Sequence, residues 1–257
     1  MPIRLTPASK VLLIAFVVGF VLQQTGDQFL GMNIMSWLGL VPAEFMLQHR
    51  FWQLFTYVFV HFDVLQLFLN LMMVAMIGSE LESIWGRWRF LRFFFFCSTF
   101  SGVSYLLLQI FVRGSDGLHH PMAGASGGIY GLLMAFGLLY GERVLLFMMV
   151  FPMKAKNFVW ILAGLEFMTS VFSGRGGLSS AAHLAGMAAG FLYLWGKASW
   201  MVIKRNRQGK LLAKFMGRNP FAAATKKGRQ HLKLIINNEP PKPGEFEGDR
   251  DDPKTWH

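Results

Sequence analysis

Six long apolar runs constrain this chain more than any other feature of its sequence. Each run has roughly the 17 to 25 residues that a helix needs to cross a bilayer, and each contains at most one charged side chain. The runs are residues 11–29, 63–79, 91–112, 122–141, 157–173 and 177–200. Of the 257 residues, 53% are hydrophobic and only 15% are charged, which is too apolar for a soluble domain of this size. The sequence therefore predicts an all-α, multi-pass integral membrane protein with six spanning helices.

The distribution of Lys and Arg predicts how these helices are oriented, because cytoplasmic loops carry an excess of positive charge. One side of the predicted membrane carries Arg4, Lys10, Arg87, Arg89, Arg92, Arg143, Lys154, Lys156 and the basic tail. The other side carries only Arg50, Arg113 and Arg175. We therefore expect both termini in the cytoplasm, with the second, fourth and sixth helices running from outside to inside.

The composition changes after the last run, so we divide the chain into a membrane domain, residues 1–203, and a cytoplasmic tail, residues 204–257. The tail carries 13 of the 25 Lys and Arg residues against 6 Asp and Glu. A basic segment beside a membrane helix contacts anionic lipid headgroups more often than nucleic acid. We expect lipid headgroups and no nucleic acid as its partners, and partial disorder, mainly in its Pro- and acid-rich end.

One serine stands among glycines at the outer end of the fourth run, in the string Gly124-Ala125-Ser126-Gly127. A serine in a membrane helix usually bonds back to a carbonyl one turn earlier, and small residues usually serve helix packing. The string alone is therefore weak support for a nucleophile, which also needs a base. The sixth run supplies a candidate base, His183, in a second stretch of small residues.

Polar residues also mark the beginning of the second run. Asp63 and Gln66 have capping-box spacing, which predicts that the helix starts at Asp63 and that Gln66 helps to cap it. Asn70 follows one turn later on the same face, at a depth where polar side chains usually face the bundle interior. For Asn70, an interhelical hydrogen bond and a catalytic role both remain open at this point.

Asn70, Ser126 and His183 are predicted to lie at one depth. Each stands within about seven residues of the outer end of its helix, which at about 1.5 Å per residue is on the order of 5–10 Å below the outer surface. Three helices would thus present an amide, a hydroxyl and an imidazole at one level of the bundle.

Glycines indicate which two of these helices approach most closely, because small residues four positions apart allow helix backbones to touch. The fourth helix has Gly127 and Gly131, and the sixth has Gly186 and Gly190. We expect these two helices to meet along their glycines, so that Ser126 reaches His183. Tyr130, one turn after Ser126, is expected to pack its ring against His183 and hold its orientation.

Taken together, these stretches resemble the rhomboid family of intramembrane serine proteases over roughly residues 10–203. The matching positions are Trp52, His61, Asn70, Glu82-x-x-Trp85-Gly86, Gly124-Ala125-Ser126-Gly127 with Tyr130, and His183-Leu184-Ala185-Gly186 with Gly190. The resemblance implies a six-helix rhomboid-like bundle. We expect it in the plasma (inner) membrane of a bacterium.

The resemblance also implies roles for individual residues. Ser126 would be the nucleophile and His183 the general base of a dyad that has no acid partner. Asn70 and the backbone N–H of Ser126 would form the oxyanion hole. His61 and the glycines Gly124, Gly127, Gly131, Gly186 and Gly190 would support and pack the dyad. Substrates would be single-span membrane proteins that enter between the second and fifth helices, and we expect no metal and no cofactor.

Two positions depart from the family pattern. Gln66 stands where many members carry a second histidine, and Gln53 stands where they carry an arginine after the loop tryptophan. An amide both donates and accepts, so Gln66 can cap the helix by accepting the N–H of Asp63 and still donate to an oxyanion.

Two other classes of function stay open. A non-catalytic scaffold would bind transmembrane segments in the same groove, and a small transporter would need charged groups near the bilayer centre. Glu166 in the fifth run is the strongest candidate for such a group. An ionised carboxylate in lipid is costly, so we expect Glu166 to be neutral and hydrogen-bonded toward the bundle, not paired with His183. Glu166→Gln would then keep activity.

Overall fold

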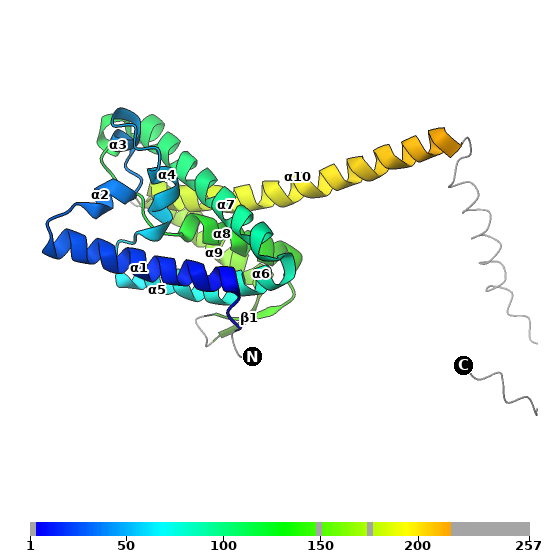
Figure 1. The fold of residues 1–257 in the computed structure, drawn as a ribbon, viewed down its shortest axis with the longest axis horizontal. Helices are drawn as coiled ribbons and strands as arrows, with labels where there is room; N and C mark the ends of the chain where they lie inside the picture. The colour runs from blue at the N-terminus through cyan, green and yellow to red at the C-terminus, as the bar shows by residue number, and fades with distance from the viewer. Residues whose placement is uncertain (1–3, 148–150, 174–176, 217–257) are drawn as a thin grey trace, which may run out of the picture. The chain divides into compact units, whose positions relative to one another are not determined.

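The computed structural model of the protein describes residues 4–147, 151–173 and 177–216, which are mostly helical (Figure 1). The acid-rich end of the tail and Arg175, both subjects of sequence predictions, lie outside these residues. The chain divides into two units, Met1–Ala198 and Ser199–His257. The first unit contains every residue predicted to form the site.

The described part of the chain consists mainly of helices joined by short connections. In chain order the elements are α1 (Pro7–Phe29), α2 (Ile34–Leu38), α3 (Pro42–Leu47), α4 (Gln53–Thr56), η1 (Tyr57–Phe59), α5 (Val64–Met73), η2 (Val74–Gly78), α6 (Ser79–Trp85), α7 (Arg87–Leu108), η3 (Gln109–Arg113), η4 (Gly114–Gly117), α8 (Ser126–Leu139), β1 (Val144–Phe147), β2 (Phe151–Lys154), α9 (Ala155–Phe172) and α10 (Gly177–Met216). The π-helical turn η2 joins α5 to α6, so these three elements form one continuous helical stretch.

Four stretches among the described residues are long and apolar enough to cross a membrane. They are Pro7–Phe29, Val64–Trp85, Arg87–Arg113 and Gly177–Met201, and they correspond to the first, second, third and sixth predicted spans. The fourth predicted span corresponds to the shorter apolar helix α8, and the fifth to the 18-residue helix α9. The protein is thus an integral membrane protein, while the count of six spans and the orientation stay predictions.

The described residues depart from an all-α chain in one segment, between α8 and α9. There β1 and β2 pair antiparallel, from Val144 opposite Lys154 to Phe147 opposite Phe151. Just before β1, the exposed carboxylate of Glu142 accepts hydrogen bonds from Lys154 and Lys156. These bonds lower the pKa of Glu142 to about 2.

The helix α8 begins later than the sequence predicts, with Ser126 as its first residue. The four residues before it are not helical. Met122 pairs with Leu40 through two backbone hydrogen bonds of 2.9 Å, and the N–H of Gly124 donates to the carbonyl of Tyr57 at 2.9 Å. Gly124 has φ +106°, a value that a residue with a side chain rarely adopts. The prediction of a fourth helix starting at residue 122 is wrong, because the backbone of this segment pairs with Leu40, between α2 and α3, and with Tyr57, directly after α4.

The helices α8 and α10 approach each other along their glycines, as the sequence predicts. A Cβ atom added to Gly186 would lie 2.3 Å from the carbonyl oxygen of Gly127, and one added to Gly190 would lie 2.8 Å from that of Gly131. On the opposite side, a Cβ added to Gly131 would lie 2.4 Å from the sulfur of Cys97 in α7. The helix α8 is therefore held between α7 and α10 with no room for a side chain at these positions.

Glu82 fixes the start of α1 against α6. Its carboxylate accepts hydrogen bonds from the backbone N–H groups of Ala8 and Ser9, each at 2.8 Å, and from the hydroxyl of Thr6. These N–H groups belong to the first turn of α1 and have no acceptor within that helix. A buried carboxylate from another helix thus takes the place of a local cap.

Gly186→Ala should lower the melting temperature, because the new methyl group would overlap a backbone oxygen that cannot move aside alone. We expect a loss of about 1–3 kcal/mol in the free energy of unfolding, the usual cost of overpacking, measured by thermal unfolding in detergent. Gly196→Ala on the same helix is the matched control, since nothing lies within 4 Å of its added methyl group. Equal melting temperatures for both variants would contradict the close packing.

Candidate active site

Ser126 and His183 meet in the structure. Ser126 Oγ, at the start of α8, lies 2.7 Å from Nε2 of His183, the seventh residue of α10. This distance is typical of a hydrogen bond involving a hydroxyl group. The side chain of His183 is 18% exposed and Ser126 is 9% exposed. The two side chains are therefore mostly buried but still partly accessible to solvent.

Tyr130 packs against one face of the imidazole ring of His183. Its ring stacks on that of His183, with centroids 4.9 Å apart and planes inclined by 11°. Tyr130 lies one turn after Ser126 on α8, so the same helix supplies the hydroxyl and the platform for the imidazole. This is the arrangement that the sequence predicts for the tyrosine.

Glu166 also contacts His183, contrary to the prediction from the sequence. Oε1 of Glu166 lies 3.1 Å from Nδ1 of His183 and also accepts the hydroxyl hydrogen of Tyr130. The expectation that Glu166 and His183 do not pair is therefore wrong. Glu166 lies six residues before the end of α9, and His183 lies six residues after the start of α10. If the distance from the outer end of the helix had also been counted for Glu166, the sequence would have placed Glu166 and His183 at the same depth.

The start of α8 leaves backbone donors beside the serine. The first hydrogen bond of this helix runs from the N–H of Ile129 to the carbonyl of Ala125, at 3.1 Å. The N–H of Ser126 precedes it and has no acceptor within the helix. Ala125, at the cap position, makes no side-chain cap hydrogen bond, so the N–H groups that follow Ser126 are not capped by it either. The positive end of the helix dipole also lies here, so an anionic oxygen beside Ser126 would be stabilised.

Asn70 brings a second donor to this region. It is 5% exposed, and its Nδ2 has no acceptor among the described residues. Such a buried, unpaired donor costs about 1–3 kcal/mol. A Cβ atom on Gly124 would lie 3.4 Å from this nitrogen and 2.6 Å from Nε2 of Gln66. Glycine at this position therefore leaves space for both amides.

Gln66 connects two segments next to the serine. Its backbone N–H donates to Oδ1 of Asp63 at 2.8 Å, which confirms the predicted N-cap. Its Oε1 accepts the N–H of Phe62 at 2.9 Å, not that of Asp63 as predicted. Its Nε2 donates to the carbonyl of Ala123 at 2.9 Å, which leaves one amide hydrogen for another acceptor. Gln66 thus ties the start of α5 to the strand-like segment before Ser126.

His61 and the dyad do not share a contact in the described part of the chain. The ring of His61 packs against Phe16 of α1, with centroids 5.7 Å apart, and burial lowers its pKa to about 4. Its backbone exchanges two hydrogen bonds of 2.9 Å with the side chain of Gln23. His61 therefore fixes the turn before α5 to α1, and its predicted support of Ser126 and His183 stays a prediction.

Gln53, the second departure from the family pattern, organises the loop between α1 and α5. Its side chain is buried, with Nε2 donating to the carbonyl of Ser36 at 2.7 Å and Oε1 accepting the N–H of Val41 at 3.1 Å. An amide supplies both a donor and an acceptor. This residue ties together the loop that also holds Met122 through Leu40.

A cavity of about 440 Å³ adjoins the pair. Polar groups at its wall come from Gln66, Asn70, Ser126, Tyr130 and His183. The rest of the lining is apolar and comes from Leu65, Leu69, Met72 and Met73 on α5, Ile129 and Leu133 on α8, and Phe158 and Leu162 on α9. The cavity therefore lies between α5 and α9 and is suited to an apolar chain with one polar reaction centre.

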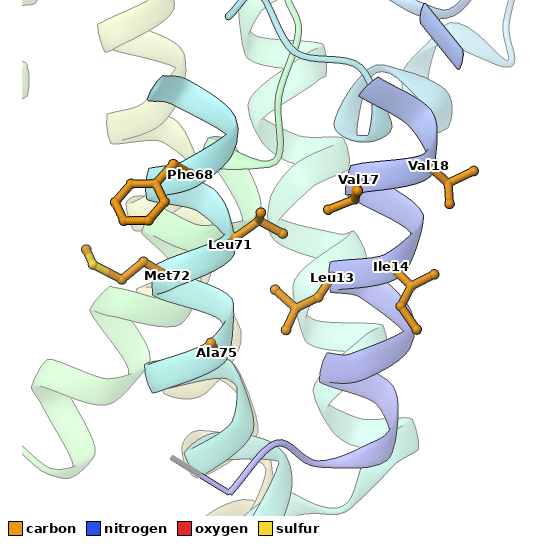
Figure 2. Close-up of a pocket in the computed structure, with 8 residues that line it drawn as sticks. All are labelled: Leu13, Ile14, Val17, Val18, Phe68, Leu71, Met72 and Ala75. Carbon is orange, nitrogen blue, oxygen red and sulfur yellow. The ribbon is translucent and has the colours of Figure 1, made fainter. Parts of the chain in front are cut away.

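A second hollow, of about 540 Å³, lies between α1 and α5 (Figure 2). Its lining is entirely apolar and consists of Leu13, Ile14, Val17, Val18, Phe68, Leu71, Met72 and Ala75. It offers no group for chemistry. The described part of the chain also contains no cluster of three or more His, Cys, Asp or Glu that could hold a metal ion.

Comparison with known proteins matches this region to one family. A family model described as Rhomboid domain covers residues 48–200. The rhomboid protease GlpG of Yersinia pseudotuberculosis serotype I is 28% identical over 185 residues, which cover 71% of this chain and 59% of that protein. GlpG of Yersinia pestis gives the same values. Rhomboid-like protein 15 of Arabidopsis thaliana is 25% identical over 170 residues, 63% of this chain and 40% of that protein.

Proposed function

The chain belongs to the rhomboid family, and we propose that it is an intramembrane serine protease that cleaves transmembrane segments of other membrane proteins. The observation that carries the proposal is the 2.7 Å hydrogen bond between Ser126 Oγ and His183 Nε2. The proposal is also supported by the similar Yersinia proteins, which are named rhomboid proteases. A scaffold that only bound transmembrane segments would have no use for a serine hydroxyl held against an imidazole.

The proposed reaction is acyl transfer through a covalent intermediate. Nε2 of His183 takes the proton of Ser126 while Oγ bonds to the carbonyl carbon of the substrate. The imidazolium then gives that proton to the leaving amine, and the peptide bond breaks. Water, activated by the same imidazole, releases the acyl group from Ser126. These steps use no metal and no cofactor.

The oxyanion of each tetrahedral intermediate needs donors placed in advance. We assign this role to the N–H of Ser126 and to Nδ2 of Asn70, because the first has no helical acceptor and the second has no acceptor among the described residues. Gln66 contributes mainly by holding the carbonyl of Ala123. Its remaining amide hydrogen is available as an auxiliary donor.

The cavity between α5 and α9 supports the proposed class of substrate. Its walls are apolar except near Ser126, which favours a single transmembrane segment entering from the side. The segment must unwind there, because a peptide bond inside a helix is already hydrogen-bonded and closed to attack. We therefore propose single-span membrane proteins as substrates, cleaved where their helices open.

The membrane placement belongs to the same proposal. We propose six spans with both termini in the cytoplasm of a bacterium, in its plasma membrane, and a membrane domain that ends at residue 203. The chain aligns with 59% of the length of the GlpG relatives, so the activity of those whole proteins is carried over here only as a proposal. The basic tail would contact anionic headgroups and no nucleic acid.

Ser126→Ala and His183→Ala should each abolish cleavage of a transmembrane reporter by the purified protein in detergent or vesicles. Because the two side chains act as a unit, the double variant should be no slower than either single variant. Ser126→Ala should keep its native melting temperature, since it removes one hydroxyl group. Losses that add up in the double variant would argue against a dyad.

Asn70→Ala should lower kcat by about 10²–10³-fold, the usual cost of one oxyanion donor, with little change in melting temperature. Gln66→Ala is the contrasting variant, because it removes two hydrogen bonds that hold Phe62 and Ala123. It should lower stability by about 1–3 kcal/mol and slow cleavage less than Asn70→Ala does. Gln66→His should retain activity. Native kcat in Asn70→Ala would show that the oxyanion is bound elsewhere.

A further inference from the structure

A carboxylate stands behind the imidazole on the side away from the serine. Three helices meet there, since Glu166 lies on α9, Tyr130 on α8 and His183 on α10. Oε1 of Glu166 lies 3.1 Å from Nδ1 of His183 and accepts the Tyr130 hydroxyl as well. The side chains of Glu166 and His183 are only 14% and 18% exposed. The contact is therefore a sheltered one.

Among the described residues of α5, α8, α9 and α10, His183 is the only group that can carry a positive charge next to Glu166. Neither α5, nor α8, nor residues 177–196 of α10 contain Lys, Arg, Asp or Glu. On α9, Lys156 is ten residues from Glu166, about 15 Å along the helix axis. The other titratable groups on these segments are Tyr130 and Tyr193. An ionised carboxylate is costly at this depth unless it is paired, and the described contacts pair it with the imidazole.

The position of this contact matters for the chemistry. To accept the serine proton, Nε2 of His183 must be unprotonated, so a neutral ring must carry its proton on Nδ1. An acceptor at Nδ1 selects that tautomer and fixes the plane of the ring, which is the task of the aspartate in soluble triads. The Tyr130 hydroxyl holds the same carboxylate oxygen, while its ring holds the face of the imidazole.

We propose that Glu166 is a positioning residue for His183, so that a carboxylate supports the serine and the histidine, where the family resemblance implies no acid partner. The proposal rests on the proposed protease function. When Nε2 takes the proton of Ser126, the ring becomes an imidazolium whose Nδ1–H points at Glu166. The carboxylate keeps its negative charge and gains no proton. The proton leaves later from Nε2 to the departing amine.

The test compares Glu166→Gln with the native protein, because glutamine keeps the shape and removes the charge. We expect kcat to fall by about 10- to 100-fold, the range for loss of a hydrogen bond to a charged group. KM should stay within about twofold, since Glu166 does not touch substrate. Glu142→Gln, which removes an exposed carboxylate from the hairpin segment, is the matched control and should keep native kcat.

The pH dependence separates positioning from a merely structural role. The rate of fluorophosphonate labelling at Ser126 should fall at low pH, where His183 is protonated. Without the negative charge of Glu166 the imidazolium is less stable, so this acid limb should move to lower pH in Glu166→Gln. Native kcat in Glu166→Gln, or a reduced rate with an unmoved acid limb, would overturn the proposal.

Two further measurements, the protonation of the His183 ring and the labelling of Ser126, separate a failure of this inference from a failure of the proposed protease function. If Glu166→Gln does not fold, ¹⁵N NMR of the native protein can show which ring nitrogen of His183 carries the proton. The signal of His183 is assigned by its loss in His183→Ala. A proton on Nδ1 supports the role of Glu166, and a proton on Nε2 of the neutral ring overturns it. If the native protein is not labelled at Ser126, the proposed protease function itself fails, and this inference fails with it.

Discussion

The contact between the backbones of α8 and α10 is the constraint on which the site depends. Gly186 faces the carbonyl of Gly127 so closely that a methyl group would lie 2.3 Å from it. Only at this separation do the short side chain of Ser126 and the imidazole of His183 reach 2.7 Å. In lipid no hydrophobic effect drives helices together, so this approach must come from small residues that allow dense packing.

Around this contact, polar groups from separate helices satisfy one another within an apolar bundle. Tyr130 and Glu166 engage the imidazole, and Gln66 engages the segment before Ser126. Because hydrogen bonds are strong and unpaired groups costly in such surroundings, the described network is rigid around the serine. Asn70 is the exception, since its amide nitrogen remains unpaired among the described residues. An unpaired donor at this place agrees with the proposed role of Asn70 in binding an oxyanion.

Patterns within single segments predicted most of this arrangement. The glycine spacing identified the helix pair, the depth of Ser126 and His183 brought them together, and Asp63 marked the start of α5. What the sequence missed depends on contacts between distant segments. Leu40 pairs with Met122 and shortens α8, and Glu166 of α9 contacts His183 of α10. Such contacts leave no periodic signal in the sequence of either segment. The family resemblance implies a dyad of two residues and therefore assigns no role to Glu166.

We propose that Ser126 is a nucleophile activated by His183 inside the bundle. The most direct measurement is peptide mapping by mass spectrometry after the purified native protein reacts with a fluorophosphonate, with His183→Ala treated in parallel. We expect one phosphonylated residue, Ser126, in the native protein and none in His183→Ala. An unmodified Ser126 in the folded native protein, or equal modification of Ser126 in His183→Ala, would contradict it.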